Sequence, residues 1–507
     1  MGSKPLTTES NSASRSQDRR RSLAPLRSSL LIAGQSVAAS TGASFERINP
    51  VSADVASIAS AASIEDAQAA ALAAAAAFPK WSATSPNVRR SLLEKAASVL
   101  KGKREDVAVR MMAETGATRQ WCDENVNFGA EILLDAAAMT TMITGSVLPT
   151  DKTGMTSFAM RQPAGVCLAM APWNAPLLLG VRSVAMALAC GNTVVLKSSE
   201  LCPATHRLIG DVLTEAGFPA GVVNVISNAP ADASIIVETL IGHPVVRRVN
   251  FTGSTRVGRS IALLGAKYLK RCLLELGGKA PFIVLDDADL EEAVRAAAFG
   301  AFYNQGQICM STERIIVLDS IADAFVERFS AKAKTLKAGD PGRGHMPLGA
   351  LITSDSARRV RAMIDDAVSK GAELRAGGDA RDALMDATVI DRVTRPMRLY
   401  HEESFGPVAS IIRVEDVEEA ISVANDCEYG LSGAVFGRDV SRALQVAQRI
   451  ESGICHINSA TVEDEPHMPF GGVKASGYGR FGGQSALDEF TELRWVTIAE
   501  GPRDYPI

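Results

Sequence analysis

The N-terminal part of the globular chain carries apolar residues at helical spacing. Ser63 stands three residues before Asp66, the pattern of a capping box, and an alanine-rich stretch then runs to Phe78. Apolar residues recurring every three or four positions predict two further helices, over residues 86–102 and 120–144. This part of the chain is therefore expected to be mainly helical.

After Leu148 the hydrophobic period changes from helical to strand-like. Residues 156–161 and 165–171 are predicted strands, and the second is nearly all apolar, as in a parallel sheet covered on both faces. Strands and helices then alternate. The expected strands are 193–197, 222–226 and 249–251, and the expected helices are 204–216, 231–241 and 255–264. This rhythm predicts an α/β fold with an open, doubly wound sheet.

A second α/β series follows Glu275. Its expected strands are 281–285, 314–317, 409–414 and 433–436, and its expected helices are 290–304, 356–370 and 415–424. The chain is thus expected to form two α/β domains, which fits its 507 residues.

Composition excludes several classes of protein. Hydrophobic residues make up 47% and charged residues 22%, and the net charge of −4 argues against a nucleic-acid binder. No apolar run reaches the ~20 residues that span a bilayer, so no membrane association is expected. The eight cysteines form no Cys-x-x-Cys pair and the six histidines no cluster, so neither a disulfide framework nor a metal site is expected. A reducing, cytoplasmic location follows.

Residues 1–30 differ from the rest of the chain. They are rich in serine and arginine, including Arg19, Arg20 and Arg21, and hold only Glu9 and Asp18 as acids. This composition is compatible with an organellar transit peptide, but a disordered N-terminal extension is the favoured interpretation.

Cys309 and Glu275 are the candidate reactive groups. A cysteine in a glycine-containing loop supplies a nucleophile, and a carboxylate that ends an apolar run should have a raised pKa and suit a general base. Taken alone, each has a structural alternative. Cys309 could be a buried structural thiol, and Glu275 could form an ion pair with Lys270 or Arg271.

Asn174 follows the apolar strand over residues 165–171 and precedes a predicted helix. Its amide can donate a hydrogen bond to a developing oxyanion, together with the backbone N–H of Cys309. The alternative is an N-cap for the helix beginning at Pro176. The two roles are compatible, since capping uses the side-chain oxygen.

Nucleotide-binding signals lie at the ends of two predicted strands. There is no Gly-x-Gly-x-x-Gly fingerprint, but Gly253 and Ser254 join a strand to a helix whose N-terminus favours a pyrophosphate. Lys197 and Glu200 follow another strand. A carboxylate there can accept from ribose hydroxyls and would repel a 2′-phosphate, which favours NAD over NADP.

Together these motifs resemble those of the aldehyde dehydrogenase superfamily, in the expected order and over nearly the whole chain from about residue 30. The motifs are Pro-Trp-Asn, Lys-Ser-Ser-Glu, Phe-Thr-Gly-Ser-Thr, Glu-Leu-Gly-Gly-Lys, Gly-Gln-Ile-Cys and Glu-Glu-Ser-Phe-Gly-Pro. The resemblance implies that Cys309 is the nucleophile, Glu275 the general base and Asn174 the oxyanion donor. Members that pass the acyl group to coenzyme A typically lack this carboxylate, so hydrolysis to a free acid is expected.

The resemblance also implies a cofactor site and an assembly. Lys197 and Glu200 would hold the adenosine ribose, Ser254 the pyrophosphate, and Glu403 the nicotinamide ribose. Further cofactor-binding residues implied by the motifs are Trp173, Gly253, Gly277 and Phe405. The implied parts are a NAD-binding domain (31–144 and 161–276), a catalytic domain (277–477) and an element for dimer or tetramer assembly (145–160 and 478–507).

Within the family, the runs around residues 269–274 and 306–314 resemble dehydrogenases of salicylaldehyde, vanillin and benzaldehyde. On the helix after Asn174, residues Ala175, Leu178, Leu179 and Arg182 share one face. Arg182 could bond a phenolic oxygen or stack on a ring, or else pair with a neighbouring domain or subunit. By analogy, the further candidate pocket residues are Trp121, Ile308, Met310 and Phe470.

The resulting hypothesis is NAD-dependent oxidation of an aromatic aldehyde to its acid through a thioester on Cys309. The nearest alternative is the same chemistry on an aliphatic aldehyde or a semialdehyde, whose distal carboxylate Arg182 would hold. A nucleotide-binding protein without catalysis and a cofactor-free esterase are more distant alternatives.

Overall fold

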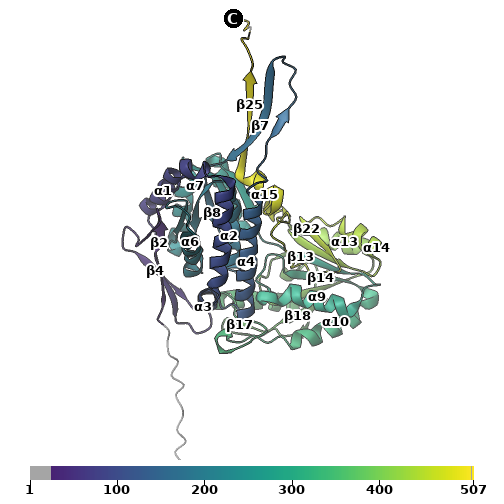
Figure 1. Ribbon diagram of the computed structural model, residues 1–507. Helices are drawn as coiled ribbons and strands as arrows, with labels where there is room; N and C mark the ends of the chain where they lie inside the picture. The colour runs from purple at the N-terminus through teal and green to yellow at the C-terminus, as the bar shows by residue number, and fades with distance from the viewer. Residues whose placement is uncertain (1–23, 504) are drawn as a thin grey trace, which may run out of the picture.

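The computed structural model describes residues 24–503 and 505–507, and it consists of two α/β units with a small sheet projecting beyond them (Figure 1). The expected extension over residues 1–30 falls mostly outside the described residues. Residues 26–30, however, belong to the folded part of the chain, so the extension ends earlier than the predicted boundary at residue 30. Strand β1 (Leu26–Ser28) pairs with β5 (Val55–Ser60), and the apolar side chain of Leu30 is buried in the core of the first unit.

The first unit is built on an eight-stranded sheet. Its strands, in spatial order, are β24 (Gly477–Tyr478), β12 (Arg271–Glu275), β11 (Val246–Thr252), β8 (Val166–Met170), β9 (Thr193–Lys197), β10 (Val223–Ile226), β2 (Leu30–Ile32) and β3 (Gln35–Val37). The five central strands are parallel, and the edges are antiparallel. Strands β8 and β9 are buried at every position, as the apolar residues at the centre of each strand predict.

Helices cover both faces of this sheet, which confirms the predicted doubly wound α/β architecture. One face packs against α2 (Pro86–Gly102), α4 (Arg119–Met139), α5 (Pro176–Ala189) and α6 (Pro203–Ala216), and the other against α1 (Ile64–Ser82), α7 (Ala233–Gly242) and α8 (Thr255–Lys267). Helix α1 begins at the predicted capping box, in which Ser63 and Asp66 bond each other's backbone. The remaining elements are α3 (Arg104–Thr115), β4 (Ser44–Ile48) and a short 3-10 turn (Pro230–Asp232).

The second unit is a seven-stranded sheet, parallel except at β15. Its spatial order is β15 (Glu373–Ala376), β18 (Thr388–Asp391), β19 (Val408–Val414), β14 (Thr312–Leu318), β13 (Ala280–Val284), β21 (Ser432–Phe436) and β22 (Ile454–Ile457). Helices α9 (Leu290–Phe302) and α10 (Asp319–Lys334) cover one face, and α11 (Ser354–Ser369), α12 (Arg398–His401), α13 (Val417–Asn425) and α14 (Val440–Ala447) cover the other. The short elements are η2 (Tyr303–Gly306), η3 (Pro341–Arg343), β16 (Ala380–Arg381), β17 (Leu384–Met385), β20 (Tyr429–Gly430) and β23 (Val473–Lys474).

A third sheet of three antiparallel strands projects from the two units (Figure 1). It consists of β6 (Ser146–Leu148), β7 (Met155–Pro163) and β25 (Thr491–Ala499). Of the element expected over 145–160 and 478–507, the second segment therefore contributes fewer residues to this sheet than predicted, since the sheet takes in only β25 from it. Tyr478 pairs with β12 of the first sheet, and α15 (Gly483–Phe490) packs on α5, because the apolar face of α15 is buried there. No helix among residues 24–503 is long and apolar enough to cross a bilayer.

Candidate active site

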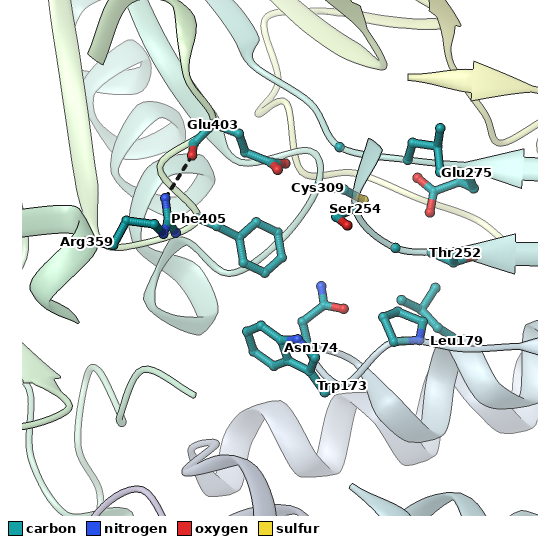
Figure 2. A pocket seen from close by; sticks show the side chains of 14 residues that line it. Trp173, Asn174, Leu179, Thr252, Ser254, Glu275, Cys309, Arg359, Glu403 and Phe405 are labelled. Carbon is teal, nitrogen blue, oxygen red and sulfur yellow. Dashed lines mark hydrogen bonds between the residues drawn. The ribbon is translucent and has the colours of Figure 1, made fainter. Parts of the chain in front are cut away.

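The candidate reactive groups meet at the carboxyl edge of the first sheet. Asn174 follows β8, Glu275 ends β12, and Cys309 approaches from the loop between α9 and β14 of the second unit. They line one cavity of about 300 Å³ (Figure 2). Because parallel strands all end at the same edge, residues far apart in sequence converge there, as in other doubly wound sheets. The cavity is lined by Pro172, Trp173, Asn174, Leu179, Thr252, Gly253, Ser254, Glu275, Leu276, Gly277, Cys309, Arg359, Glu403 and Phe405.

The loop that carries Cys309 has an unusual backbone. Asn304, Gln305 and Gly306 are consecutive residues with positive φ, and a Cβ on Gly306 would lie 2.2 Å from the Gly406 carbonyl oxygen. Such a run is costly for the two residues that are not glycine. Side-chain bonds hold it in place: Gln305 donates to the Ala350 carbonyl, and Asn304 donates to the Asn174 carbonyl at 3.0 Å. The loop thereby ties the nucleophile to the strand end that bears Asn174.

The Asn174 side chain points toward the nucleophile loop. Its Nδ2 donates to the Gln307 carbonyl at 2.8 Å, and its backbone carbonyl accepts from the Trp121 indole at 2.8 Å. The alternative of an N-cap is wrong, because helix α5 is preceded by Ala175 at the cap position and no side chain caps it. The amide is therefore oriented by the Cys309 loop rather than by the helix.

Glu275 is buried, and neither of its carboxylate oxygens has a hydrogen-bond partner among the described residues. Burial raises the pKa of Glu275 to about 7, against the smaller opposing effects of the neighbouring Cys309 thiol and then of the Arg182 cation. The alternative of an ion pair is wrong: Lys270 donates to the carbonyls of His243 and Val246, and Arg271 pairs with Glu489. Glu275 can therefore accept and release a proton near neutral pH.

Cys309 is a partly exposed free thiol beside this carboxylate. Burial, and then the negative charge of Glu275, raises the pKa of Cys309 well above that of an ordinary thiol. The thiol is consequently protonated at neutral pH in this state, so forming the thiolate requires a nearby base. Glu275 is the carboxylate placed to serve as that base.

The opposite side of the cavity carries the residues predicted to hold a dinucleotide. Ser254 caps helix α8 by accepting from the Val257 N–H, and its helix N-terminus faces the cavity. A Cβ on Gly277 would lie 2.8 Å from the Glu403 carboxylate, so this position needs a glycine. Glu403 accepts from the Gly278 N–H at 2.9 Å, and burial raises its pKa to about 8.

Arg359 also lines this side of the cavity, although none of the sequence motifs indicated it. It donates to the backbone carbonyls of Glu403 and Ser404, and so holds the loop whose Phe405 ring meets Trp173 edge to face at 5.6 Å (Figure 2). Its position on α11 offers no local signal, since the contact depends on how α11 packs against that loop.

Lys197 and Glu200 lie outside the cavity lining. They form an ion pair with each other at the end of β9, and Asn228 donates to Glu200 at 3.0 Å. Both sit at the same sheet edge as Gly253 and Ser254, where a dinucleotide extending from the cavity would pass. The donor and acceptor set fits a dinucleotide.

A second cavity of about 340 Å³ adjoins the first and shares Asn174, Leu179 and Cys309 with it. All seven residues predicted for the substrate pocket line it: Trp121, Ala175, Leu178, Arg182, Ile308, Met310 and Phe470. Sequence reasoning missed the other aromatic walls, Phe128, Phe299 and Tyr303. A helical repeat could have indicated part of them, since Trp121, Glu124, Phe128 and Glu131 share one face of α4.

Arg182 is held at the wall of this second cavity. Its Nη2 bonds the Asp464 carboxylate at 2.6 Å, and its guanidinium lies 4.8 Å from the centre of the Phe470 ring and 5.5 Å from that of Phe128. The ion-pair alternative for Arg182 is thus observed, with a partner from the second unit. Its Nη1 has no partner among the described residues.

A thiol beside a carboxylate of raised pKa and an oriented amide, at the carboxyl edge of a doubly wound sheet, is the arrangement of an enzyme that forms a covalent intermediate on sulfur. The chain belongs to the aldehyde dehydrogenase family, whose family model matches residues 37–496. This confirms the assignment made from the motifs. The family acts on aldehydes with a nicotinamide dinucleotide, NAD or NADP.

Similar proteins cover nearly the whole chain. A vanillin dehydrogenase of Pseudomonas fluorescens is 58% identical over 478 residues, which are 94% of this chain and 99% of that protein. The crystal structure of a salicylaldehyde dehydrogenase from Pseudomonas putida G7 complexed with salicylaldehyde has a TM-score of 0.93 at 47% identity, covering 95% of this chain and 100% of that one. The structure of PnpE in complex with nicotinamide adenine dinucleotide has a TM-score of 0.90 at 36% identity, covering 94% and 99%.

Proposed function

We propose that this aldehyde dehydrogenase oxidises aromatic aldehydes to carboxylic acids with NAD. The observation that carries the proposal is the second cavity, which opens on Cys309 and is walled by Trp121, Phe128, Tyr303 and Phe470. Aromatic walls favour a flat apolar ring through edge-to-face contacts. The similarity to vanillin and salicylaldehyde dehydrogenases supports the same substrate class.

In the first step the Cys309 sulfur attacks the aldehyde carbon, and the thiol proton passes to Glu275. The carbonyl oxygen becomes an oxyanion, which the Asn174 amide and the Cys309 backbone N–H stabilise by hydrogen bonds. Asn174 already lies on the Cys309 loop through its bond to Gln307, so little reorganisation is needed. The raised pKa of Glu275 makes it a competent proton acceptor.

When bound, the nicotinamide supplies the hydride acceptor that turns the thiohemiacetal into a thioester. Glu275 first releases the thiol proton to solvent and, ionised again, takes a proton from a water molecule whose oxygen attacks the thioester carbon. The carbon–sulfur bond breaks, the acid leaves, and Cys309 regains its proton. Glu275 thus serves both half-reactions, which a buried carboxylate titrating near neutrality permits.

Several residues are proposed to hold the cofactor. Ser254 and the N-terminus of α8 would bind the pyrophosphate, and Glu403, with Phe405 and Trp173 beside it, would hold the nicotinamide ribose. Because Gly253 and Gly277 have no side chains, they would leave room for the cofactor beside the backbone. Lys197 and Glu200 would bind the adenosine ribose, and the Glu200 carboxylate would repel a 2′-phosphate, which favours NAD over NADP.

Arg182 is proposed to contact the substrate ring or a phenolic oxygen through its unpartnered Nη1. Ala175, Leu178, Ile308 and Met310 would shape the remaining walls. The alternative substrates, aliphatic aldehydes and semialdehydes, would use the same chemistry.

We further propose that the third sheet drives assembly into a homodimer or tetramer in the cytoplasm. The sheet exposes a set of large apolar side chains on β6 and β25: Val147, Leu493, Trp495 and Ile498. Exposed apolar residues concentrated on a projecting sheet mark an interaction surface. Light scattering of a Trp495→Asp variant tests this, and an unchanged molecular mass would contradict it.

The substrate proposal is tested by cofactor reduction with salicylaldehyde, vanillin, benzaldehyde, hexanal and succinate semialdehyde. We expect kcat/KM for the aromatic aldehydes to exceed the others at least tenfold, which is ~1.4 kcal/mol of differential transition-state binding. A preference for hexanal or the semialdehyde would refute the aromatic substrate class. Repeating the assay with NADP tests the cofactor choice.

A further inference from the structure

Among the described residues that line the second cavity, Arg182 is the one cation, and it is already paired. Arg182 lies on α5 of the first unit, and Asp464 lies in the loop between β22 and β23 of the second. Their side chains are 6% and 14% exposed, and the bonded atoms are 2.6 Å apart. The ion pair therefore spans the two walls of the cavity at a place largely shielded from water.

The planar guanidinium group of Arg182 is held by aromatic rings near it as well as by the carboxylate that bonds one of its nitrogens. The rings of Phe470 and Phe128 lie at 4.8 and 5.5 Å from the guanidinium carbon, and Asp464 holds one terminal nitrogen. Cation–π contacts and a short charge-assisted bond together favour this one position. The guanidinium is thus not free to swing toward an anionic ligand without breaking a buried ion pair.

The other charges of the cavity are all negative. Apart from Arg182, the charged residues that line it are Glu124, Glu131, Glu463 and Asp464. An aldehyde that also carries an ionised carboxylate would lose the hydration of that carboxylate on entering the cavity. It would then face four carboxylates and one arginine, whose charge Asp464 already neutralises. Burying a charge without a partner is strongly unfavourable. An uncharged aromatic aldehyde has no charge to desolvate, and its ring contacts the aromatic side chains that line the cavity.

We propose that Asp464 is a specificity-determining residue, which neutralises Arg182 and so excludes aldehydes that carry a distal carboxylate. This inference rests on the proposed function, because it concerns the same cavity and the same reaction. It separates uncharged aromatic aldehydes from the semialdehydes that remained as alternative substrates.

The first test compares two probes on the unaltered enzyme: 4-carboxybenzaldehyde and its methyl ester, which has a similar shape but no charge. We expect kcat/KM for the ester to exceed that for the acid at least tenfold. Equal values would overturn the inference while leaving aromatic oxidation intact. If benzaldehyde itself were not oxidised, the proposed function would fail instead, and the charge comparison would be made with hexanal and succinate semialdehyde.

The second test uses Asp464→Asn, which keeps the shape of the side chain and removes its charge. Arg182 is then an unneutralised cation, and we expect the acid-to-ester ratio of kcat/KM to rise at least tenfold, mainly through a lower KM for the acid. Glu465→Gln is the matched control, since Glu465 is the next residue of the loop and does not line the cavity. Its ratio should stay at the value of the unaltered enzyme.

The double variant Arg182→Gln with Asp464→Asn decides the cause. If the gain depends on the freed cation, the double variant loses it. A ratio that is unchanged in Asp464→Asn, or a gain that persists without Arg182, would overturn the inference. Circular dichroism of each variant shows that the compared proteins are folded, and the two-probe comparison on the unaltered enzyme stands even if a variant does not fold.

Discussion

The Glu313 carboxylate bonds the Lys279 ammonium at 2.6 Å, and both side chains are almost completely buried. The same carboxylate accepts from the backbone N–H groups of Ser404 and Phe405 at 2.9 and 3.0 Å. Phe405 has a φ of +47°, a conformation that a bulky residue adopts only where neighbours hold it. The buried pair therefore joins the turn after Glu275 and the strand after Cys309 to the loop of Glu403.

Lys279→Met should destabilise the protein strongly, because it leaves the Glu313 charge buried without its partner. Loss of one member of a buried ion pair costs about 3–5 kcal/mol. The midpoint of urea unfolding measures the effect. As a control, Lys337→Met removes the exposed cation of the pair with Asp386, which should cost no more than about 1 kcal/mol. Similar midpoints for the two variants would contradict the assigned role of burial.

Cys309→Ala should lower dehydrogenase turnover by at least about a thousandfold, since the covalent intermediate cannot form. Cofactor affinity, followed by quenching of tryptophan fluorescence, should remain within a few-fold. Cys427→Ala provides the control, because Cys427 is also partly exposed but lines neither cavity. Substantial turnover by the Cys309→Ala variant would refute the mechanism.

The rate should rise with pH through about 7, because Glu275 must be ionised to accept a proton and burial places its pKa there. In Glu275→Gln this limb of the pH profile should vanish. Because Glu275 takes the thiol proton as well as the water proton, both the formation of reduced cofactor in the first turnover and the steady-state rate should fall, and no rapid burst should precede the steady state. A rising limb unchanged in the variant would assign it to another group.

Glu275 should also lower stability at high pH. Its folded pKa of about 7 lies above the unfolded value of ~4.3, so the folded state holds the proton more tightly and stability falls as pH rises between these values. Glu275→Gln should therefore be more stable than the unaltered enzyme at pH ~8, by about 4 kcal/mol at most, and the difference should shrink near pH ~4. Thermal unfolding at the two pH values measures it, and equal differences at both would contradict the linkage.

Gly277→Ala should weaken NAD binding. The new Cβ would lie 2.8–3.1 Å from the Glu403 carboxylate and displace it from the cavity. We expect the Kd and KM for NAD to rise about tenfold, which is ~1.4 kcal/mol. Gly102→Ala is the control, since a Cβ there meets nothing within 4 Å. Unaltered NAD affinity in Gly277→Ala would remove Glu403 from the proposed ribose site.

Much of the fold could be predicted because its signals are local. The strands over 193–197 and 432–436 and the helix over 86–102 follow from apolar runs and helical spacing, within a residue or so of the observed bounds. Helix α3, at Arg104–Thr115, was not predicted. It begins directly after α2, with Lys103 serving as C-cap of one helix and N-cap of the other, so no strong break separates them in the sequence.

The sequence alone determined the family, the order of the elements and the reacting groups, because these depend on short motifs and on the period of apolar positions. Only the tertiary structure decided how those groups behave. The pKa of Glu275 depends on burial by residues from both units, and Asp464 meets Arg182 across 282 positions of the chain. Burial and long-range charge pairing are properties of packing, which no local pattern of residues encodes.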